Sequence, residues 1–175
     1  MSLYVVDVES DGGAPGIYSM VSLGVVRVDR EMKTTFKALF APISDKWIPK
    51  ALAISGITRE EHLAYPDPEI GMRGLSKFLN DTSNGRAIFL SDNLAFDWQF
   101  PNYYFHKYEI PNPFGFSGNR IGNFYAGLEK DWFASSKWKR FRKTKHTHDP
   151  VDDAKGNVEA MIEIADKYGV KIPGL

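Results

Sequence analysis

The sequence predicts an α/β fold in which helices pack on a sheet of mixed direction. Three strand-like segments follow one another in the first 41 residues, and a helical segment separates them from a fourth apolar strand at 86–91. Strands joined by short turns pair antiparallel, whereas strands joined through a helix favour a parallel pair. A long amphipathic helix over 151–168 completes the expected order β-β-β-α-β-α-β-α.

Composition restricts the class of protein. The 175 residues fit a single domain covering residues 1–175, and a hydrophobic content of 43% is enough for a folded core. The formal net charge is zero, so any nucleic-acid site has to be a local basic patch. The absence of cysteine excludes disulfides and thiolate metal sites and favours a reducing compartment. No apolar run approaches the roughly 18–20 residues of a membrane span, so we expect a soluble, cytoplasmic protein without membrane contact.

The first strand, at residues 3–10, is an apolar run interrupted by two carboxylates. Alternate residues of a strand point to the same face, so Asp7 and Glu9 project side by side, with backbones roughly 6–7 Å apart. Two acids placed this way at the end of a buried strand repel each other unless a cation lies between them, and a divalent metal ion is the simplest cation. The alternative is that the strand ends at Val6 and both acids are solvated turn residues.

The segments after the first strand alternate between turn residues and periodic apolar runs. Thr58 and Glu61 have the spacing of a capping box, which predicts the start of a short helix. Pro101 predicts a kink or a break in a later aromatic, helix-like segment. The expected elements are strands at 17–29, 34–41, 86–91 and 120–128, and helices starting at 58, at 68–79 and at 93–109.

A second acidic segment follows the fourth strand. Asn93 and Asp97 share one face of a helical turn there. Functional groups of α/β sheets gather beyond the carboxyl ends of the strands, so parallel first and fourth strands would bring Asp97 close to Asp7. Trp98 is placed to stack on a terminal base. The alternatives are a surface aspartate and a core tryptophan.

A third segment combines a histidine with an aspartate at a helix start. Asp149 is a favourable N-cap and Pro150 a favourable first helical residue, so His148 precedes the helix and Asp153 lies in its early turns. Such a pair supplies a mobile base and a fixed ligand. Asp152 is interpreted as a complement to the helix dipole, and we expect His146 to be a loop residue.

Together these segments resemble the DEDDh branch of 3′-to-5′ exonucleases. The branch has motifs Asp-x-Glu, Asn-x-x-x-Phe-Asp and His-x-x-x-x-Asp-Ala, in that order. The matching residues are Asp7, Glu9, Asn93, Phe96, Asp97, His148, Asp153 and Ala154. The resemblance implies an RNase H-like fold, with a mixed five-stranded sheet and helices on both faces. Ser10-Asp11 departs from the family, where a threonine commonly follows the first motif, and this departure affects the expected substrate contacts.

The resemblance also implies a two-metal mechanism. The four carboxylates, Asp7, Glu9, Asp97 and Asp153, would hold two Mg²⁺ or Mn²⁺ ions about 3.5–4 Å apart. Oxygen ligands without cysteine suit these hard cations. His148 would be the general base that takes a proton from the attacking water, because histidine titrates near neutral pH. The expected products are nucleoside 5′-monophosphates released from the 3′ end.

A basic segment before His148 suggests a single-stranded substrate. It interleaves cations for phosphates with rings for bases, and its residues are Lys137, Trp138, Lys139, Arg140, Phe141, Arg142, Lys143 and Lys145. We expect substrate contacts from five residues: Asn93, Trp98, Lys139, Arg140 and Arg142. A solvated charged segment is the alternative. RNA is favoured over DNA through a fainter resemblance to a group of bacterial exoribonucleases.

Three other functions stay open at this point. The chain could be a DNA exonuclease of the proofreading or repair type, a nucleic-acid-binding protein that has lost catalysis, or a non-enzymatic acidic metal-binding domain. Inactivity predicts that a carboxylate or the base is missing, and none is missing. No residue pattern demands a homodimer, although relatives of this kind often pair.

Overall fold

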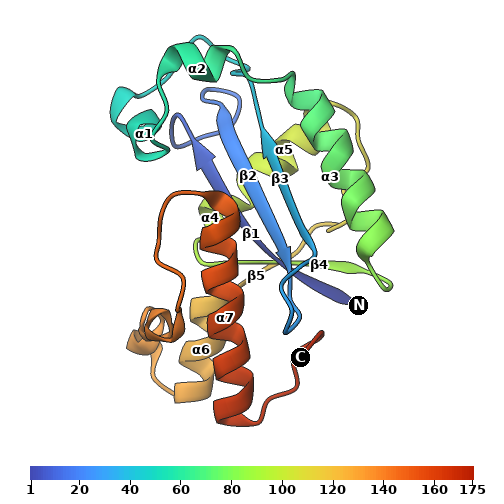
Figure 1. The fold of residues 1–175 in the computed structure, drawn as a ribbon, viewed down its shortest axis with the longest axis vertical. Helices are drawn as coiled ribbons and strands as arrows, with labels where there is room; N and C mark the ends of the chain where they lie inside the picture. The colour runs from blue at the N-terminus through green and yellow to red at the C-terminus, as the bar shows by residue number, and fades with distance from the viewer.

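A computed structural model describes all residues 1–175 and shows a five-stranded mixed sheet, in the order β3-β2-β1-β4-β5 (Figure 1). The strands are β1 (Ser2–Ser10), β2 (Met20–Arg27), β3 (Thr35–Leu39), β4 (Ala87–Ser91) and β5 (Gly118–Arg120). The first three strands form an antiparallel meander, and β4 and β5 run parallel to β1. The predicted fold class is confirmed.

Helices cover both faces of this sheet. The helices are α1 (Pro49–Ile54), α2 (Arg59–Leu63), α3 (Pro68–Thr82), α4 (Leu94–Asp97), α5 (Gln99–Lys107), α6 (Ile121–Glu129) and α7 (Pro150–Tyr168). Two 3₁₀ helices, η1 (Trp132–Ala134) and η2 (Lys137–Phe141), connect α6 to the loop before α7. None of these helices is both long and apolar enough to span a bilayer.

The side chains of β1 alternate between two separate cores. Tyr4, Val6 and Val8 pack in a core with residues of α3 and α5. Leu3 and Val5 point to the opposite face and pack in a second core with residues of α6, η2 and α7. Strand β1 is therefore the shared centre of the molecule, as its β-branched sequence predicts.

The structure differs from the prediction at two elements. The prediction of a fifth strand at 120–128 is wrong over most of that range, since β5 ends at Arg120 and α6 begins at Ile121. Ile121 and Tyr125 have helical i, i+4 spacing and both are fully buried against α7. The helix expected at 93–109 is divided into α4 and α5 at Trp98, and Pro101 lies in the first turn of α5, where proline is tolerated.

Candidate active site

Asp7 and Glu9 extend the face of β1 that α7 covers. They follow Leu3 and Val5 on the same side of the strand, so the stripe that is apolar at the start of β1 becomes acidic at its end. Strand β1 continues through Ser10, and both acids are paired in register with β2 residues. The alternative that the strand ends at Val6 is therefore wrong.

Helix α7 brings Asp153 and His148 to this acidic end of β1. Asp149 caps the helix by accepting hydrogen bonds from two backbone N–H groups, and Pro150 is the first helical residue, as predicted. Gly24 of β2 lets the start of α7 approach the sheet: a Cβ there would lie 2.3 Å from the Pro150 carbonyl carbon. Asp153 is fully buried against the sheet.

Helix α4 brings Asp97 from the carboxyl end of β4. Asp97 is 4% exposed, and one of its oxygens accepts a hydrogen bond from the Asn93 backbone N–H at 3.2 Å. Burial raises the pKa of Asp97 to about 7, although hydrogen bonds to the carboxylate oppose the shift. The Asp97 charge is also one cause of the raised pKa of Asp7, as expected for neighbouring acids.

The acids of β1 and α7 form a compact set of oxygen donors. One carboxylate oxygen from each of Asp7, Glu9 and Asp153 lies within 4.8 Å of the other two. Burial raises the pKa of Asp7 well above its ordinary value, the charges of Asp97, Glu9 and Asp153 raise it further, and the Arg142 charge opposes them. Burial likewise raises the pKa of Glu9, against the effect of His148. A divalent cation would relieve this repulsion, so the donor set fits a hard metal ion.

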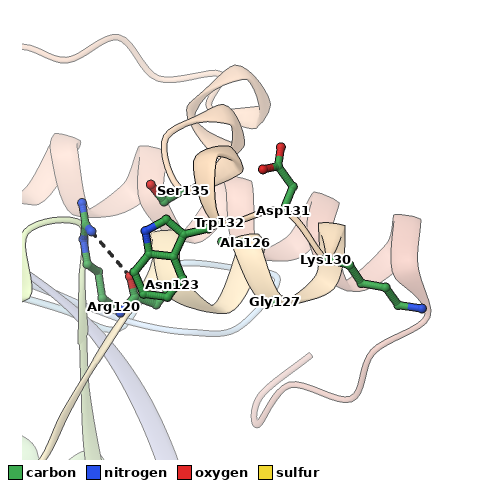
Figure 2. Close-up of a pocket in the computed structure, with 8 residues that line it drawn as sticks. All are labelled: Arg120, Asn123, Ala126, Gly127, Lys130, Asp131, Trp132 and Ser135. Atoms are coloured by element: carbon green, nitrogen blue, oxygen red, sulfur yellow. Dashed lines mark hydrogen bonds between the residues drawn. The ribbon is translucent and has the colours of Figure 1, made fainter.

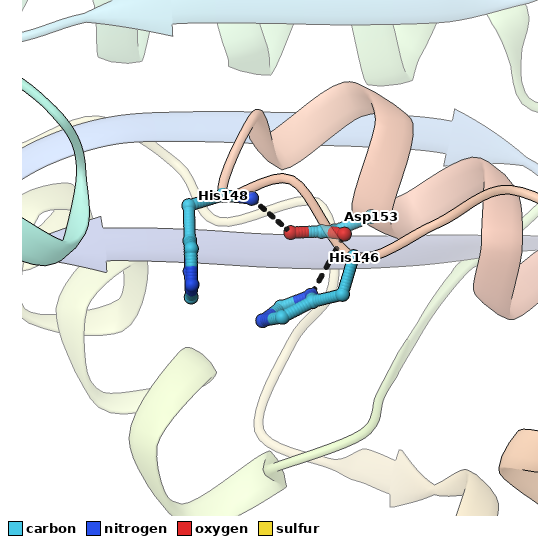
Figure 3. Close-up of side chains that lie close together, drawn as sticks. All are labelled: His146, His148 and Asp153. Atoms are coloured by element: carbon cyan, nitrogen blue, oxygen red, sulfur yellow. Dashed lines mark hydrogen bonds and ion pairs between the residues drawn. The ribbon is translucent and has the colours of Figure 1, made fainter.

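His148 lies at the edge of the acidic cluster with its ring against Glu9. Its Nδ1 is 3.3 Å from Glu9 Oε1, and 41% of its side chain is exposed. The His148 backbone N–H donates to Asp153 Oδ2 at 2.9 Å, which ties the histidine to α7 (Figure 3). If Nδ1 carries the proton that Glu9 accepts, Nε2 is the basic atom.

Asp153 accepts further hydrogen bonds that the sequence did not predict. Arg142 donates to its Oδ1 at 3.0 Å, and the Thr147 backbone N–H donates to the same oxygen at 3.1 Å. His146 Nδ1 lies 2.7 Å from that oxygen, and the two histidine rings are 4.3 Å apart (Figure 3). His146 is a loop residue, as expected. Its contact with Asp153 could have been suspected only from its position two residues before His148.

Of the five residues expected to contact substrate, Lys139 and Arg142 line a cavity of about 340 Å³ beside the acidic cluster, together with His146. Lys139 also pairs with Asp92 at 2.6 Å.

The other three substrate candidates lie differently. Arg140 donates to the Tyr125 hydroxyl at 2.7 Å, on the α6 side. Trp98 is half-buried and packs edge-on against the buried Phe89, with ring centroids 5.0 Å apart, so part of its ring lies on the core. Asn93 is exposed, and its backbone supports Asp97.

One hollow of the molecule is separate from the acidic cluster. It has a volume of about 380 Å³ and lies between α6 and η1, where Arg120 donates a hydrogen bond to Asn123 Oδ1 (Figure 2). A smaller hollow of about 220 Å³ adjoins His148, and Lys37, Ser55 and Tyr65 also line it. None of the predicted catalytic residues lines the first hollow, whereas His148 lines the second.

The comparisons with known proteins agree with this geometry. A curated protein of Escherichia coli, the 3′-5′ DNA exonuclease Cap18, is 33% identical over 174 residues, covering 95% of this chain and 92% of its own length. No family model matches the sequence.

Solved structures share the fold at lower identity. The nuclease domain of 3′hExo, a DEDDh family member bound to rAMP, has a TM-score of 0.75 at 16% identity and covers 95% of this chain and 92% of its own. The cell-death related nuclease CRN-4 has a TM-score of 0.73 at 12% identity, with 95% of this chain and 64% of its own covered. Escherichia coli exonuclease I in complex with a dT13 oligonucleotide has a TM-score of 0.71 at 16% identity, and the match spans 41% of that longer chain.

The RNase H-like sheet with acids at the carboxyl ends of its central strands has the arrangement of a nuclease with a carboxylate active site. The chain belongs to the DEDDh family of 3′-to-5′ exonucleases. This fold implies divalent metal ions as cofactors.

Proposed function

We propose that the protein is a metal-dependent exonuclease that removes nucleoside 5′-monophosphates from single-stranded 3′ ends. One observation carries the proposal: the carboxylates of Asp7, Glu9 and Asp153 converge within 4.8 Å, with a partly exposed histidine held against one of them. A non-enzymatic metal-binding domain would not need that histidine. An inactive nucleic-acid-binding protein would not need all of the acids.

The residues proposed to hold two ions, Mg²⁺ or Mn²⁺, are Asp7, Glu9, Asp97 and Asp153. When bound, such ions acidify the attacking water and stabilise the leaving 3′-oxygen. The donor set supports hard cations, because it contains carboxylates and no thiolate. Burial of Asp7 and Asp97 next to each other makes a bound cation favourable.

His148 is proposed to act as the general base. Glu9 accepts a hydrogen bond from Nδ1 and thereby orients the ring, and Nε2 is left to take the proton of the water. The hollow beside His148, lined also by Lys37, Ser55 and Tyr65, is open to receive the terminal nucleotide. The cavity lined by Lys139 is proposed to receive a phosphate, which would take the place of Asp92 as the partner of Lys139.

The sugar of the substrate separates two candidates. The RNA preference stays a prediction from the sequence. The Escherichia coli relative is named a DNA exonuclease and is 33% identical, which supports DNA as the second candidate. The neighbouring structures are at most 17% identical, so their rAMP and oligodeoxynucleotide ligands do not decide between the two.

The test is a degradation assay on 5′-labelled single-stranded RNA, single-stranded DNA and duplexes with a 3′ overhang. We expect a ladder that shortens from the 3′ end with Mg²⁺ or Mn²⁺, and no ladder with EDTA. D7N is expected to lower the rate by more than the roughly 10–100-fold that follows loss of an outer-shell partner.

D45N is the matched control, because Asp45 is an exposed aspartate outside the site. A ladder that shrinks from the 5′ end, or a D7N variant as active as D45N, would contradict the proposal. The ratio of kcat/KM for RNA and DNA of one sequence decides between the two substrates.

A further inference from the structure

Arg142 is a nearly buried cation in the acidic site. Only 11% of its side chain is exposed, and its guanidinium donates to Asp153 Oδ1 at 3.0 Å. Asp153 is itself 1% exposed, so this ion pair is shielded from solvent on both sides. An arginine in the middle of a basic surface segment is expected to reach outward to phosphates, and this one instead points inward.

Gly156 of α7 provides the space for this guanidinium. A Cβ on Gly156 would lie 2.7 Å from Arg142 Nε and 2.9 Å from its Nη2, and the three nearest atoms all belong to Arg142. Glycine in a helix interior is unfavourable compared with alanine. The unfavourable glycine is explained by the close approach of Arg142 to the helix backbone.

The chain after Arg142 is also fastened to α7. Glu159, one helical turn beyond Gly156, accepts hydrogen bonds from the backbone N–H groups of Lys143 and Thr144 at 2.8 and 2.7 Å. Asp153 then accepts from the N–H groups of Thr147 and His148. The loop that carries the proposed base is therefore bound to the helix that carries a proposed metal ligand. The Arg142 guanidinium lies at Gly156, which stands between Asp153 and Glu159 along α7.

From this geometry we propose that Arg142 is a positioning residue for the nuclease reaction and not a phosphate contact. Its guanidinium fixes the carboxylate of Asp153 and keeps the His148 loop on α7, and Gly156 is required because the guanidinium lies on the helix. This role of Arg142 in catalysis rests on the proposed nuclease function. The pairing of Arg142 with Gly156 is testable without any activity.

The first test is thermal unfolding in EDTA of R142A, G156A and the double variant. We expect R142A to unfold several degrees below the wild type, because Asp153 stays buried without its cation. G156A is expected to lower the Tm while Arg142 is present and to raise it in the R142A background, since the methyl group then meets no guanidinium and alanine favours the helix.

G127A is the matched control, because Gly127 is also a helical glycine and a Cβ there would meet nothing within 4 Å. It is expected to raise the Tm in both backgrounds. If G156A behaves like G127A, with a higher Tm in the presence of Arg142, the proposed pairing is overturned.

The second test separates positioning from phosphate binding through the kinetics. A positioning role predicts that R142A lowers kcat about 10–100-fold with KM changed less than about twofold. It also predicts that R142K recovers part of kcat, that G156A lowers kcat as R142A does, and that the salt dependence of kcat/KM is unchanged. A phosphate contact predicts a higher KM and a salt slope smaller by about one, and this result would overturn the proposal.

The two proposals fail in different ways. Full activity of D7N contradicts the proposed metal-dependent function, whatever the Arg142 variants do. If G156A raises the Tm in both the wild-type and the R142A background, or lowers it in both, the positioning role of Arg142 is contradicted. That result would hold even if the enzyme is a metal-dependent exonuclease.

Discussion

His148 combines an exposed ring with a constrained backbone. Its φ angle is +61°, in the left-handed region, which is unusual for a residue that carries a Cβ. This conformation turns its N–H towards Asp153 while the ring reaches Glu9, so one residue contacts two elements that are distant in sequence. The backbone strain at this position is consistent with a functional requirement.

Asparagine is the replacement that tests His148 without disturbing this backbone. Asparagine adopts the left-handed conformation more readily than other residues with a Cβ, but it has no basic nitrogen. We expect H148N to fold with an unchanged Tm and to lose roughly 10²–10⁴-fold in kcat. A circular-dichroism melt and a single-turnover assay check this, and activity within a few-fold of the wild type would exclude His148 as the base.

Asp7 makes the metal-free site unfavourable. It is partly buried beside three other acids, and these charges and its burial raise its pKa well above the ordinary value. In the absence of metal, D7N is therefore expected to be more stable than the wild type by about 1–3 kcal/mol, the size of one close repulsion at an effective dielectric constant of about 20.

With bound metal ions, we expect the wild type to be more stable than D7N. Mg²⁺ is expected to raise the Tm of the wild type and to have little effect on D7N, because binding to the folded state is lost with the ligand. Melts in EDTA and in Mg²⁺ measure both effects, with D45N as the control for the loss of a surface charge. A lower Tm of D7N in EDTA would show that the acids do not destabilise the metal-free protein.

At the scale of elements, α2 is held on the loop that follows β1 by a buried polar cluster. Arg59 donates to Asp11 Oδ2 at 2.9 Å and to the Ser44 carbonyl at 3.0 Å, and His62 lies fully buried beside them. Asp11 is one of the residues that depart from the family pattern. The structure gives it a supporting role, since its other oxygen accepts from the Ser19 backbone N–H.

The burial of His62 predicts that the contact of α2 with the rest of the fold weakens at acidic pH. Burial lowers its pKa from the ordinary value of 6.5, against the charge of Asp11 and together with the charge of Arg59. The folded protein then binds fewer protons at His62 than the unfolded chain does, so stability is complete above pH 6.5 and is lost as the pH falls below it. H62Q is expected to lose less stability than the wild type between pH 7.5 and 5.

Urea unfolding at a series of pH values measures this difference. H106Q is the control, because His106 is exposed on α5. If H62Q and the wild type lose stability in parallel on acidification, the buried histidine is not the source of the pH dependence.

At the scale of the whole molecule, the site exists because α7 packs on one face of the sheet, with its first turns beside the acids of β1. Asp7 and Glu9 come from β1, Asp97 from α4 after the end of β4, and Asp153 from α7, so three separate elements have to meet. The close approach of Gly24 in β2 to Pro150 sets how near α7 lies to β1.

Gly24 is therefore a test of how strictly the fold positions the site. G24A is expected to push the start of α7 from the sheet, to cost about 1–3 kcal/mol of stability and to lower kcat by at least about tenfold. G74A is the control, because its methyl group would make only an ordinary contact with Phe36 at 3.4 Å. Unchanged kcat in a folded G24A would show that the site tolerates movement of α7.

The fold class and the positions of the acidic residues could be predicted from the sequence, because both depend on short-range patterns of residues. The β-branched apolar run of β1, the helix that precedes β4 and the Asp149-Pro150 start of α7 are short-range patterns, and each has the predicted structure. The short segment at 121–129 was misassigned because branched, aromatic and small residues suit a strand or a helix. Burial of Ile121 and Tyr125 against α7 decided in favour of the helix.

Other features of the site depended on contacts that the sequence does not encode locally. By itself the sequence determined that the chain has an α/β sheet with acids on β1, after β4 and at the start of α7. Only the tertiary structure turned Arg142 inward onto Asp153, brought His146 to the same carboxylate and placed Trp98 against Phe89. A basic or aromatic side chain suits solvent, substrate or core equally well in sequence. The space over Gly156 decides the place of Arg142, and the core around Phe89 decides that of Trp98.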